Sequence, residues 1–189
     1  MRPFEFVIAF YSVVLGVAVA QLMTGVGRLV EERKRVRPYW VHSLWVLTLL
    51  LVDVDNWWSL WLVRDIQSWS IFTFLLLTAL VGVIYLVTVL LFPRIPNESA
   101  PIDLRAHFFE NSRFLLFGNG AAWALALACN WSFLPFSSWL DPWVSVPAFI
   151  VVFAILAGCT KNPRAHALFS LANFAAILLL LWHDGGKIQ

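Results

Sequence analysis

Six long runs of apolar residues follow one another along the chain, separated by short polar segments. A helix needs roughly 20 residues to cross about 30 Å of hydrocarbon, and each run has or nearly has this length. The runs are continuously apolar rather than alternating, which favours helices over barrel strands. The pattern therefore predicts an all-α, polytopic membrane helix bundle of six transmembrane helices, with one transmembrane domain over residues 1–189. The runs lie near Phe4–Val30, Trp40–Val63, Trp69–Phe92, Phe114–Leu134, Val144–Cys159 and Ala165–Trp182.

Composition agrees with this pattern. The chain of 189 residues is 61% hydrophobic and 13% charged, whereas a soluble domain has about 25% charged residues. The lipid bilayer is thus the expected surroundings of the protein. A net charge of +2 and the lack of an aromatic-basic platform in the sequence predict no nucleic-acid partner.

The 13 Lys and Arg residues are unevenly distributed between alternate connections. Basic loops stay on the cytoplasmic side, so the pattern predicts an N-out/C-out protein of the cytoplasmic (inner) membrane. Met1–Ala20 imitates a secretory signal, but cleavage would leave the basic first loop outside, and we expect a retained first helix. The expected cytoplasmic set is Arg28, Arg33, Lys34, Arg35, Arg37, Arg94, Arg105, Arg113, Lys161 and Arg164, and the outer set is Arg2, Arg64 and Lys187.

The longest connection runs from Pro93 to Ser112. Pro101 followed by Asp103 is typical of a helix start, which predicts a short interfacial helix that bends or runs directly into the fourth span. Tryptophans at helix ends are expected to be interfacial anchors. They are Trp40, Trp69, Trp143 and Trp182.

Two carboxylates interrupt the second apolar run. Counted back from Val63 at 1.5 Å per residue, Asp55 lies about 12 Å and Asp53 about 15 Å from the outer end. An Asp at the centre of a spanning helix costs about 2.5–3.5 kcal/mol even on the mildest insertion scales. Three interpretations stay open: side chains near the outer headgroups that snorkel or cap, an acidic site in a polar cavity, or a purely structural buried hydrogen bond.

Helix geometry constrains all three interpretations. At about 100° per residue, Asp53 and Asp55 point about 160° apart, so that two deep carboxylates would require a central second helix. Polar residues counted to the same depth are Asn56, Tyr11, Ser12, Thr78 and Asn173. An inner polar layer would hold Gln21, Thr24, Tyr85 and Asn119, each more typical of a helix–helix hydrogen bond than of a ligand contact.

The sequence offers little for catalysis. Neither HExxH, CxxC nor a set of Ser, His and Asp is present, so we predict no enzyme, no catalytic residues, no metal site and no cofactor. Cys129 and Cys159 should lie near opposite ends of the bundle, too far apart for a disulfide. Small residues four apart favour close helix packing within a subunit, with an oligomer contact as the alternative. These ridges are Ser12, Gly16, Ala20 and Thr24, and Gly118, Ala122 and Ala126.

Three stretches resemble a group of uncharacterised small bacterial membrane proteins. They are Pro3–Phe6 with Leu15-Gly16 and Gly27–Leu29, the run Trp57–Trp61, and Asp103–Phe109. The similarity spans the first four helices and implies a bacterial cytoplasmic membrane setting. It implies no known activity, so no functional residue is carried over. The resemblance also implies that glutamine is usual near the position of Asp55, so that a carboxylate is not required there.

The leading hypothesis is a homo-oligomeric channel or small transporter that passes protons or cations through a polar path near Asp53, Asp55 and Asn56. The alternative is a non-catalytic scaffold or sensor whose basic loops dock a cytoplasmic protein partner or anionic lipid headgroups. The docking residues of the alternative would be Arg33, Lys34, Arg35, Arg37 and Arg105.

Overall fold

The computed structural model describes residues 3–66, 68–94, 100–133 and 138–184, and these residues form a helical bundle. The predicted all-α class is confirmed, and each predicted apolar run lies on a helix. A single 3₁₀ turn, η1, extends the second helix over Leu60–Val63. The helices are α1 (Pro3–Glu31), α2 (Trp40–Ser59), α3 (Ile71–Leu91), α4 (Leu104–Phe133), α5 (Pro142–Gly158) and α6 (Pro163–Asp184).

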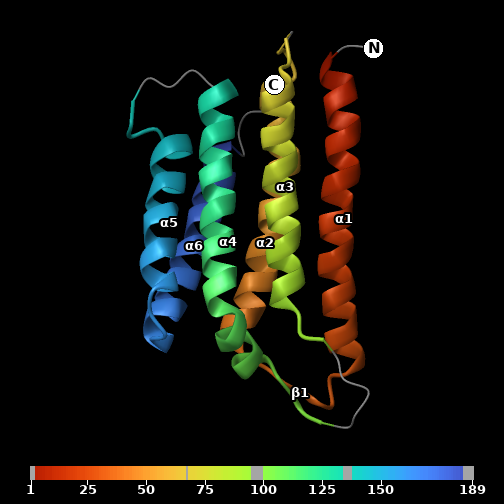
Figure 1. Ribbon diagram of the computed structural model, residues 1–189, viewed down its shortest axis with the longest axis vertical. Coiled ribbons are helices and arrows are strands. Elements are labelled where there is room, and N and C mark those ends of the chain that lie inside the picture. The colour runs from red at the N-terminus through yellow and green to blue at the C-terminus, as the bar shows by residue number, and fades with distance from the viewer. Residues whose placement is uncertain (1–2, 67, 95–99, 134–137, 185–189) are drawn as a thin grey trace.

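The six helices close into a ring. Around the ring α1 packs on α3, α3 on α4, α4 on α5, α5 on α6, α6 on α2, and α2 on α1. In Figure 1 α5, α4, α3 and α1 form a front layer, with α6 and α2 behind. The connections alternate between the two ends, so that the start of α1 and the end of α6 lie at the same end (Figure 1).

Among the described residues, five helices are long and apolar enough to cross a membrane: α1, α2 with η1, α3, α4 and α6. The sixth, α5, is apolar but has 17 residues, about 25 Å of helix at 1.5 Å per residue. Its start is well defined, because Asp141 Oδ1 accepts a 2.9 Å hydrogen bond from the backbone N–H of Trp143 and Pro142 occupies the first helical position.

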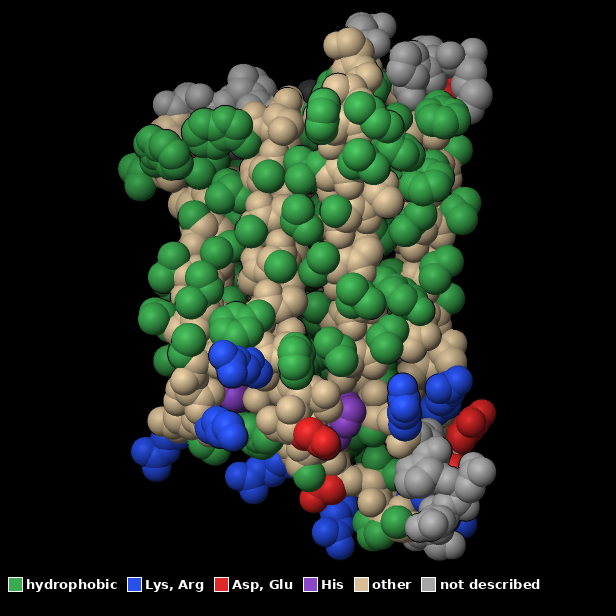
Figure 2. Space-filling model, viewed as in Figure 1, with side chains coloured by type: hydrophobic (Ala, Val, Ile, Leu, Met, Phe, Trp, Pro, Cys, Tyr) green, Lys and Arg blue, Asp and Glu red, His purple; other side chains and the backbone are tan. Residues whose placement is uncertain are grey.

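Charged side chains gather at one end of the bundle, the end of the connections α1–α2, α3–α4 and α5–α6. On the face in Figure 2 every described Lys and Arg side chain lies in this part of the molecule. We call it the basic end. Between the two ends the described surface is largely apolar, with Val13, Leu75 and Leu156 among the exposed side chains. Arg2 and Lys187, predicted for the opposite end, lie outside the described residues.

A short parallel pairing ties two connections together at the basic end. Strand β1 (Val36–Arg37) pairs with β2 (Ile102–Asp103), with Val36 opposite Ile102. Arg35 strengthens the tie, because its guanidinium donates to the Ala100 carbonyl at 3.0 and 3.2 Å and to Glu32 at 3.0 Å. Of the predicted docking residues, Arg33, Lys34, Arg37 and Arg105 are exposed, whereas Arg35 is half-buried in this tie.

The segment for which a short interfacial helix is predicted forms the first turns of α4. Asp103 Oδ1 accepts hydrogen bonds from the backbone N–H groups of Arg105 and Ala106, both at 2.9 Å, and so defines the start of this helix. From Leu104 the helix continues over 30 residues to Phe133. The described residues therefore hold no separate helix before α4.

The two small-residue ridges differ in their surroundings. On α4, a Cβ added to Gly118 would lie 2.7 Å from Val87 of α3, and one added to Gly120 would lie 3.0 Å from Ala154 of α5. Close packing within the subunit is thus confirmed for α4. On α1, by contrast, Gly16 and Ala20 are exposed, and a Cβ at Gly16 would meet nothing within 4 Å. The expectation of packing within the subunit is wrong for this ridge.

Candidate functional site

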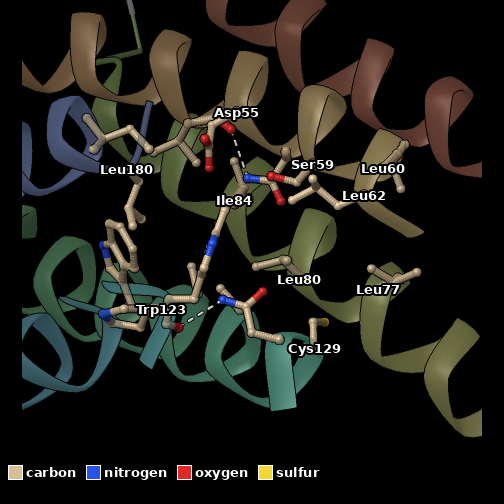
Figure 3. Close-up of a pocket in the computed structure, with 18 of the residues that line it drawn as sticks. Asp55, Ser59, Leu60, Leu62, Leu77, Leu80, Ile84, Trp123, Cys129 and Leu180 are labelled. Atoms are coloured by element: carbon tan, nitrogen blue, oxygen red, sulfur yellow. Dashed lines mark hydrogen bonds between the residues drawn. The ribbon is translucent and has the colours of Figure 1, made fainter. Parts of the chain in front are cut away.

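A cavity lies in the middle of the ring, in the half of the bundle away from the basic end. It has a volume of about 100 Å³ available to the centres of water molecules, several times the roughly 10–15 Å³ that one water needs. All six helices contribute to its wall. Figure 3 shows Asp55 and Ser59 on the α2 side and Trp123 and Cys129 on the α4 side. The remaining polar wall residues are Tyr11, Asn56, Asn119 and Asn130.

Both aspartates of α2 are buried, and they face different surroundings. Asp55 is 8% exposed and lines the cavity. Asp53 is 1% exposed, is not among the described residues that line the cavity, and receives no hydrogen bond from them on either carboxylate oxygen. Trp57, one helical turn after Asp53, is 56% exposed. The carboxylates therefore do not snorkel to the surface, and Asp53 does not make the structural hydrogen bond of the third interpretation.

Asn56 connects α2 to α1 beside the two aspartates. Its Oδ1 accepts a 3.1 Å hydrogen bond from the hydroxyl of Tyr11, and its Nδ2 donates at 2.8 Å to the backbone carbonyl of Val52. Tyr11 and Asn56 both line the cavity. The structure thus brings Asp55, Asn56 and Tyr11 together, as the sequence predicts. Asp53 is buried on the same helix but is not among the described wall residues.

Asn119, Trp123 and Asn173 form a separate hydrogen-bond network between α4 and α6. Asn173 Oδ1 accepts hydrogen bonds from Trp123 Nε1 at 2.8 Å and from Asn119 Nδ2 at 3.1 Å, and Asn173 Nδ2 donates back to Asn119 Oδ1 at 3.4 Å. Asn119 and Trp123 line the cavity, whereas Asn173 is not among its described wall residues. Residue counts from the helix ends predict different layers for Asn119 and Asn173, whereas in the structure the two side chains are hydrogen-bonded to each other.

Ser12 and Thr78 do not belong to the site. Both side chains are half-buried, and neither is among the described residues of the cavity wall. The hydroxyl of Thr78 donates at 2.9 Å to the carbonyl of Phe74 within its own helix. This bond satisfies the side chain locally, as is common for Thr in membrane helices.

The wall also contains residues that were not predicted. Trp143, expected as an interfacial anchor, is buried and lines the cavity together with Pro147 and Asn130. Proline has no N–H, so Pro147 cannot donate to the carbonyl four residues earlier, that of Trp143. Asn130 Nδ2 donates to this carbonyl instead, at 3.0 Å. A proline within an apolar helix is the sequence signal for such a freed carbonyl, but it does not tell which neighbour binds it.

Packed side chains fill the half of the bundle next to the basic end. Trp45, Phe108 and Phe169 are almost completely buried there, and Trp45 donates a 2.8 Å hydrogen bond to Ser170 of α6. His42 is buried too, and its Nε2 lies 3.1 Å from the Leu91 carbonyl. None of these residues belongs to the described cavity wall. The cavity therefore does not continue through the described residues to the basic end.

The electrostatic character of the cavity is acidic. Its described wall contains the carboxyl group of Asp55 and no Lys, Arg or His. In the described part of the chain no group of three or more His, Cys, Asp or Glu residues could hold a metal ion. An ionised Asp55 in this weakly polar surrounding favours a positive charge in the cavity, because burial in a low dielectric penalises a negative charge.

Fold and surface together define the class of the protein: it is a multi-pass helical membrane protein with a central acidic cavity. Comparisons with protein-family models, curated proteins and solved structures find no match to the chain. The family resemblance noted in the sequence therefore stays a prediction.

Proposed function

We propose that the protein is a small transporter for protons or other cations, and that Asp55 binds the cation in the central cavity. The observation that carries the proposal is the burial of Asp53 and Asp55 in a helix that is otherwise apolar enough to cross a membrane. Each carboxylate costs several kcal/mol there unless it is protonated or neutralised. The uptake and release of a positive charge by these groups accounts for carboxylates at so unfavourable a position.

The packing between the cavity and the basic end favours a transporter over a continuous pore within one subunit. Trp45, Phe108 and Phe169 fill that half of the bundle, so that a bound cation can leave toward the basic end only after the helices move. A binding site that opens alternately to either side of the membrane is the usual arrangement in transporters.

The orientation that we propose has six spans, α5 included, with both termini outside the bacterial cytoplasmic membrane. The excess of Arg and Lys at the basic end supports a cytoplasmic location of that end (Figure 2), and the cavity then lies in the outer half. Fusion of alkaline phosphatase or of green fluorescent protein to the C-terminus tests the orientation. An active phosphatase fusion and a dark fluorescent fusion are expected, and the reverse result would contradict it.

The purified protein in liposomes tests transport. We expect a proton or cation flux that the Asp53→Asn/Asp55→Asn double variant loses. Asp65→Asn is the matched control, because the exposed carboxylate of Asp65 lies beside Arg64, with Asp65 Oδ2 3.6 Å from the Arg64 Nε, and not in the described cavity wall. Equal rates for the wild type and the double variant would remove the proposal.

A second candidate function is a scaffold or sensor that docks a cytoplasmic protein or anionic lipid headgroups. The observation in its favour is the β1–β2 pairing, which holds the first basic connection in a defined shape with Arg33, Lys34 and Arg37 exposed. Each Lys or Arg near an anionic surface adds about 1 kcal/mol of binding. Neutralisation of Arg33, Lys34 and Arg37 should then abolish binding to anionic vesicles and pull-down of a partner. Unchanged binding in both assays would rule this function out.

A further inference from the structure

The cavity wall is mostly apolar, although it contains a carboxylate. Leu77, Leu80 and Ile84 of α3 and Ile177 and Leu180 of α6 line the cavity, and Figure 3 shows labelled leucines of η1, α3 and α6 around the same pocket as Asp55. A Ca²⁺ ion takes six to eight oxygen ligands, and Mg²⁺ demands octahedral oxygen coordination. Such a wall suits instead a ligand that brings its own apolar surface. Four aromatic residues contribute to the wall: Tyr11, Trp123, Phe133 and Trp143.

Five side chains of the wall donate hydrogen bonds to other groups of the protein. The Tyr11 hydroxyl donates to Asn56, the Trp123 indole to Asn173, and the Asn130 amide to Trp143. Asn56 and Asn119 likewise donate to Val52 and Asn173. The wall also contains the Asp55 carboxylate, which accepts hydrogen bonds when it is ionised, and the Ser59 hydroxyl, which can donate or accept them. A ligand that donates hydrogen bonds and carries positive charge therefore matches this wall better than an anion or a neutral acceptor.

We infer that the cation bound at Asp55 is a small organic ammonium ion with a compact apolar body. The ammonium group binds the carboxylate in a charge-assisted hydrogen bond, the aromatic residues add cation–π attraction, and the leucine and isoleucine side chains cover the apolar body. A volume of about 100 Å³ for the centres of water molecules limits the ligand to a few non-hydrogen atoms. The inference rests on the proposed function, because it takes Asp55 as the cation-binding group.

Calorimetric titration of the protein in lipid nanodiscs with tert-butylammonium chloride tests the inference. Neutral tert-butanol has the same shape and is the matched ligand. We expect saturable binding of the ammonium ion, and binding weaker by about tenfold or more both for the alcohol and in Asp55→Asn, the effect of losing one hydrogen bond to a charged group. Asp65→Asn, with the same change in net charge, should keep its affinity within about twofold.

Cys129 provides a second measurement that leaves Asp55 intact. This thiol lines the cavity, whereas Cys159 is exposed after α5. In a Cys159→Ala background, N-ethylmaleimide reaches a single thiol, and tert-butylammonium should slow its modification while tert-butanol at the same concentration should not. Equal protection by the alcohol, or protection by sodium and potassium chloride alone, would overturn the inference.

The two proposals fail in different ways. If sodium or potassium protects Cys129 from modification and the flux depends on Asp55, the organic cation is refuted and the transporter proposal stands. Specific binding of tert-butylammonium without any flux of protons, metal cations or this amine refutes the transporter and keeps the binding site. Binding of the alcohol as tight as that of the ammonium ion, unchanged in Asp55→Asn, refutes the organic cation on its own.

Discussion

The side chain of Asn130 in α4 replaces a missing backbone donor in α5. Its amide nitrogen lies 3.0 Å from the carbonyl oxygen of Trp143, the acceptor that Pro147 leaves without an intrahelical partner. In the hydrocarbon region a backbone carbonyl has no water to bind, so a helix with an internal proline depends on its neighbours for this bond.

Asn130→Ala should therefore destabilise the protein by about 1–3 kcal/mol, the cost of an unsatisfied buried polar group. Pro147→Ala restores the N–H donor at position 147. In this background Asn130→Ala should lower the stability by clearly less than it does in the wild type. Unfolding in mixed micelles with increasing sodium dodecyl sulfate measures all four proteins of the cycle. Independent, additive effects of the two substitutions would contradict the assignment.

Gly25 and Gly27 of α1 form a matched pair for packing. A Cβ at Gly25 would collide with the ring of Phe92, whereas one at Gly27 meets nothing within 4 Å. Gly25→Ala should lower stability by about 1–3 kcal/mol, as overpacking does, and Gly27→Ala should leave it unchanged or slightly higher. Thermal denaturation in detergent compares them. Equal melting temperatures would show that Phe92 moves aside without cost.

The Asn119–Asn173 pair should couple α4 to α6. Asn173→Ala leaves the Trp123 indole and the Asn119 amide without their shared acceptor, so we expect a loss of about 1–3 kcal/mol. In a double-mutant cycle with Asn119→Ala, the coupling energy should be about 0.6–1.7 kcal/mol, the range for hydrogen bonds between membrane helices. A coupling energy of zero would mean that the bonds contribute nothing to stability.

The exposed ridge on α1 leads to a prediction about self-association. We propose that the protein is a homo-oligomer, and small residues on an exposed helix face allow a second copy to approach closely. Gly16→Leu has room within the subunit but would separate two such faces. Mass photometry in nanodiscs should show a shift toward monomer for Gly16→Leu and none for the control Val13→Leu. A wild-type monomer, or an unaffected oligomer, would exclude this interface.

Asp53 and Asn56 should respond in opposite directions to the same replacement. Asn56→Leu loses the hydrogen bonds to Tyr11 and Val52 and should destabilise the protein by about 1 kcal/mol. Asp53→Leu removes a buried carboxyl group that accepts no hydrogen bond from the described residues, so its stability should equal or exceed that of the wild type. Chemical unfolding in micelles measures both. A large loss in Asp53→Leu would mean that the carboxyl group serves the fold.

The sequence predicts the helices well, because a spanning helix needs a long apolar run and the positions of Lys and Arg separate the connections. It also identifies Asp53, Asp55, Asn56 and Tyr11, since an intramembrane carboxylate is rare enough to stand out. It could not predict the Asn119–Asn173 bond, because depth counted from a helix end takes no account of tilt. Nor could it predict that Trp143 turns inward while Trp57 turns outward, because a tryptophan suits both a lipid surface and a cavity wall.

The β1–β2 pairing has a mechanical consequence. It joins two connections that are about 65 residues apart in sequence, as the bonds from Arg35 to Ala100 also show. The ends of α1, α2 and α4 next to these connections are therefore held close to one another. When these helices tilt relative to one another, they pivot near the β1–β2 pairing, and their displacement grows with distance from it. The displacement is therefore smallest at the basic end and largest at the opposite end, beside η1, in the half of the bundle that contains the cavity.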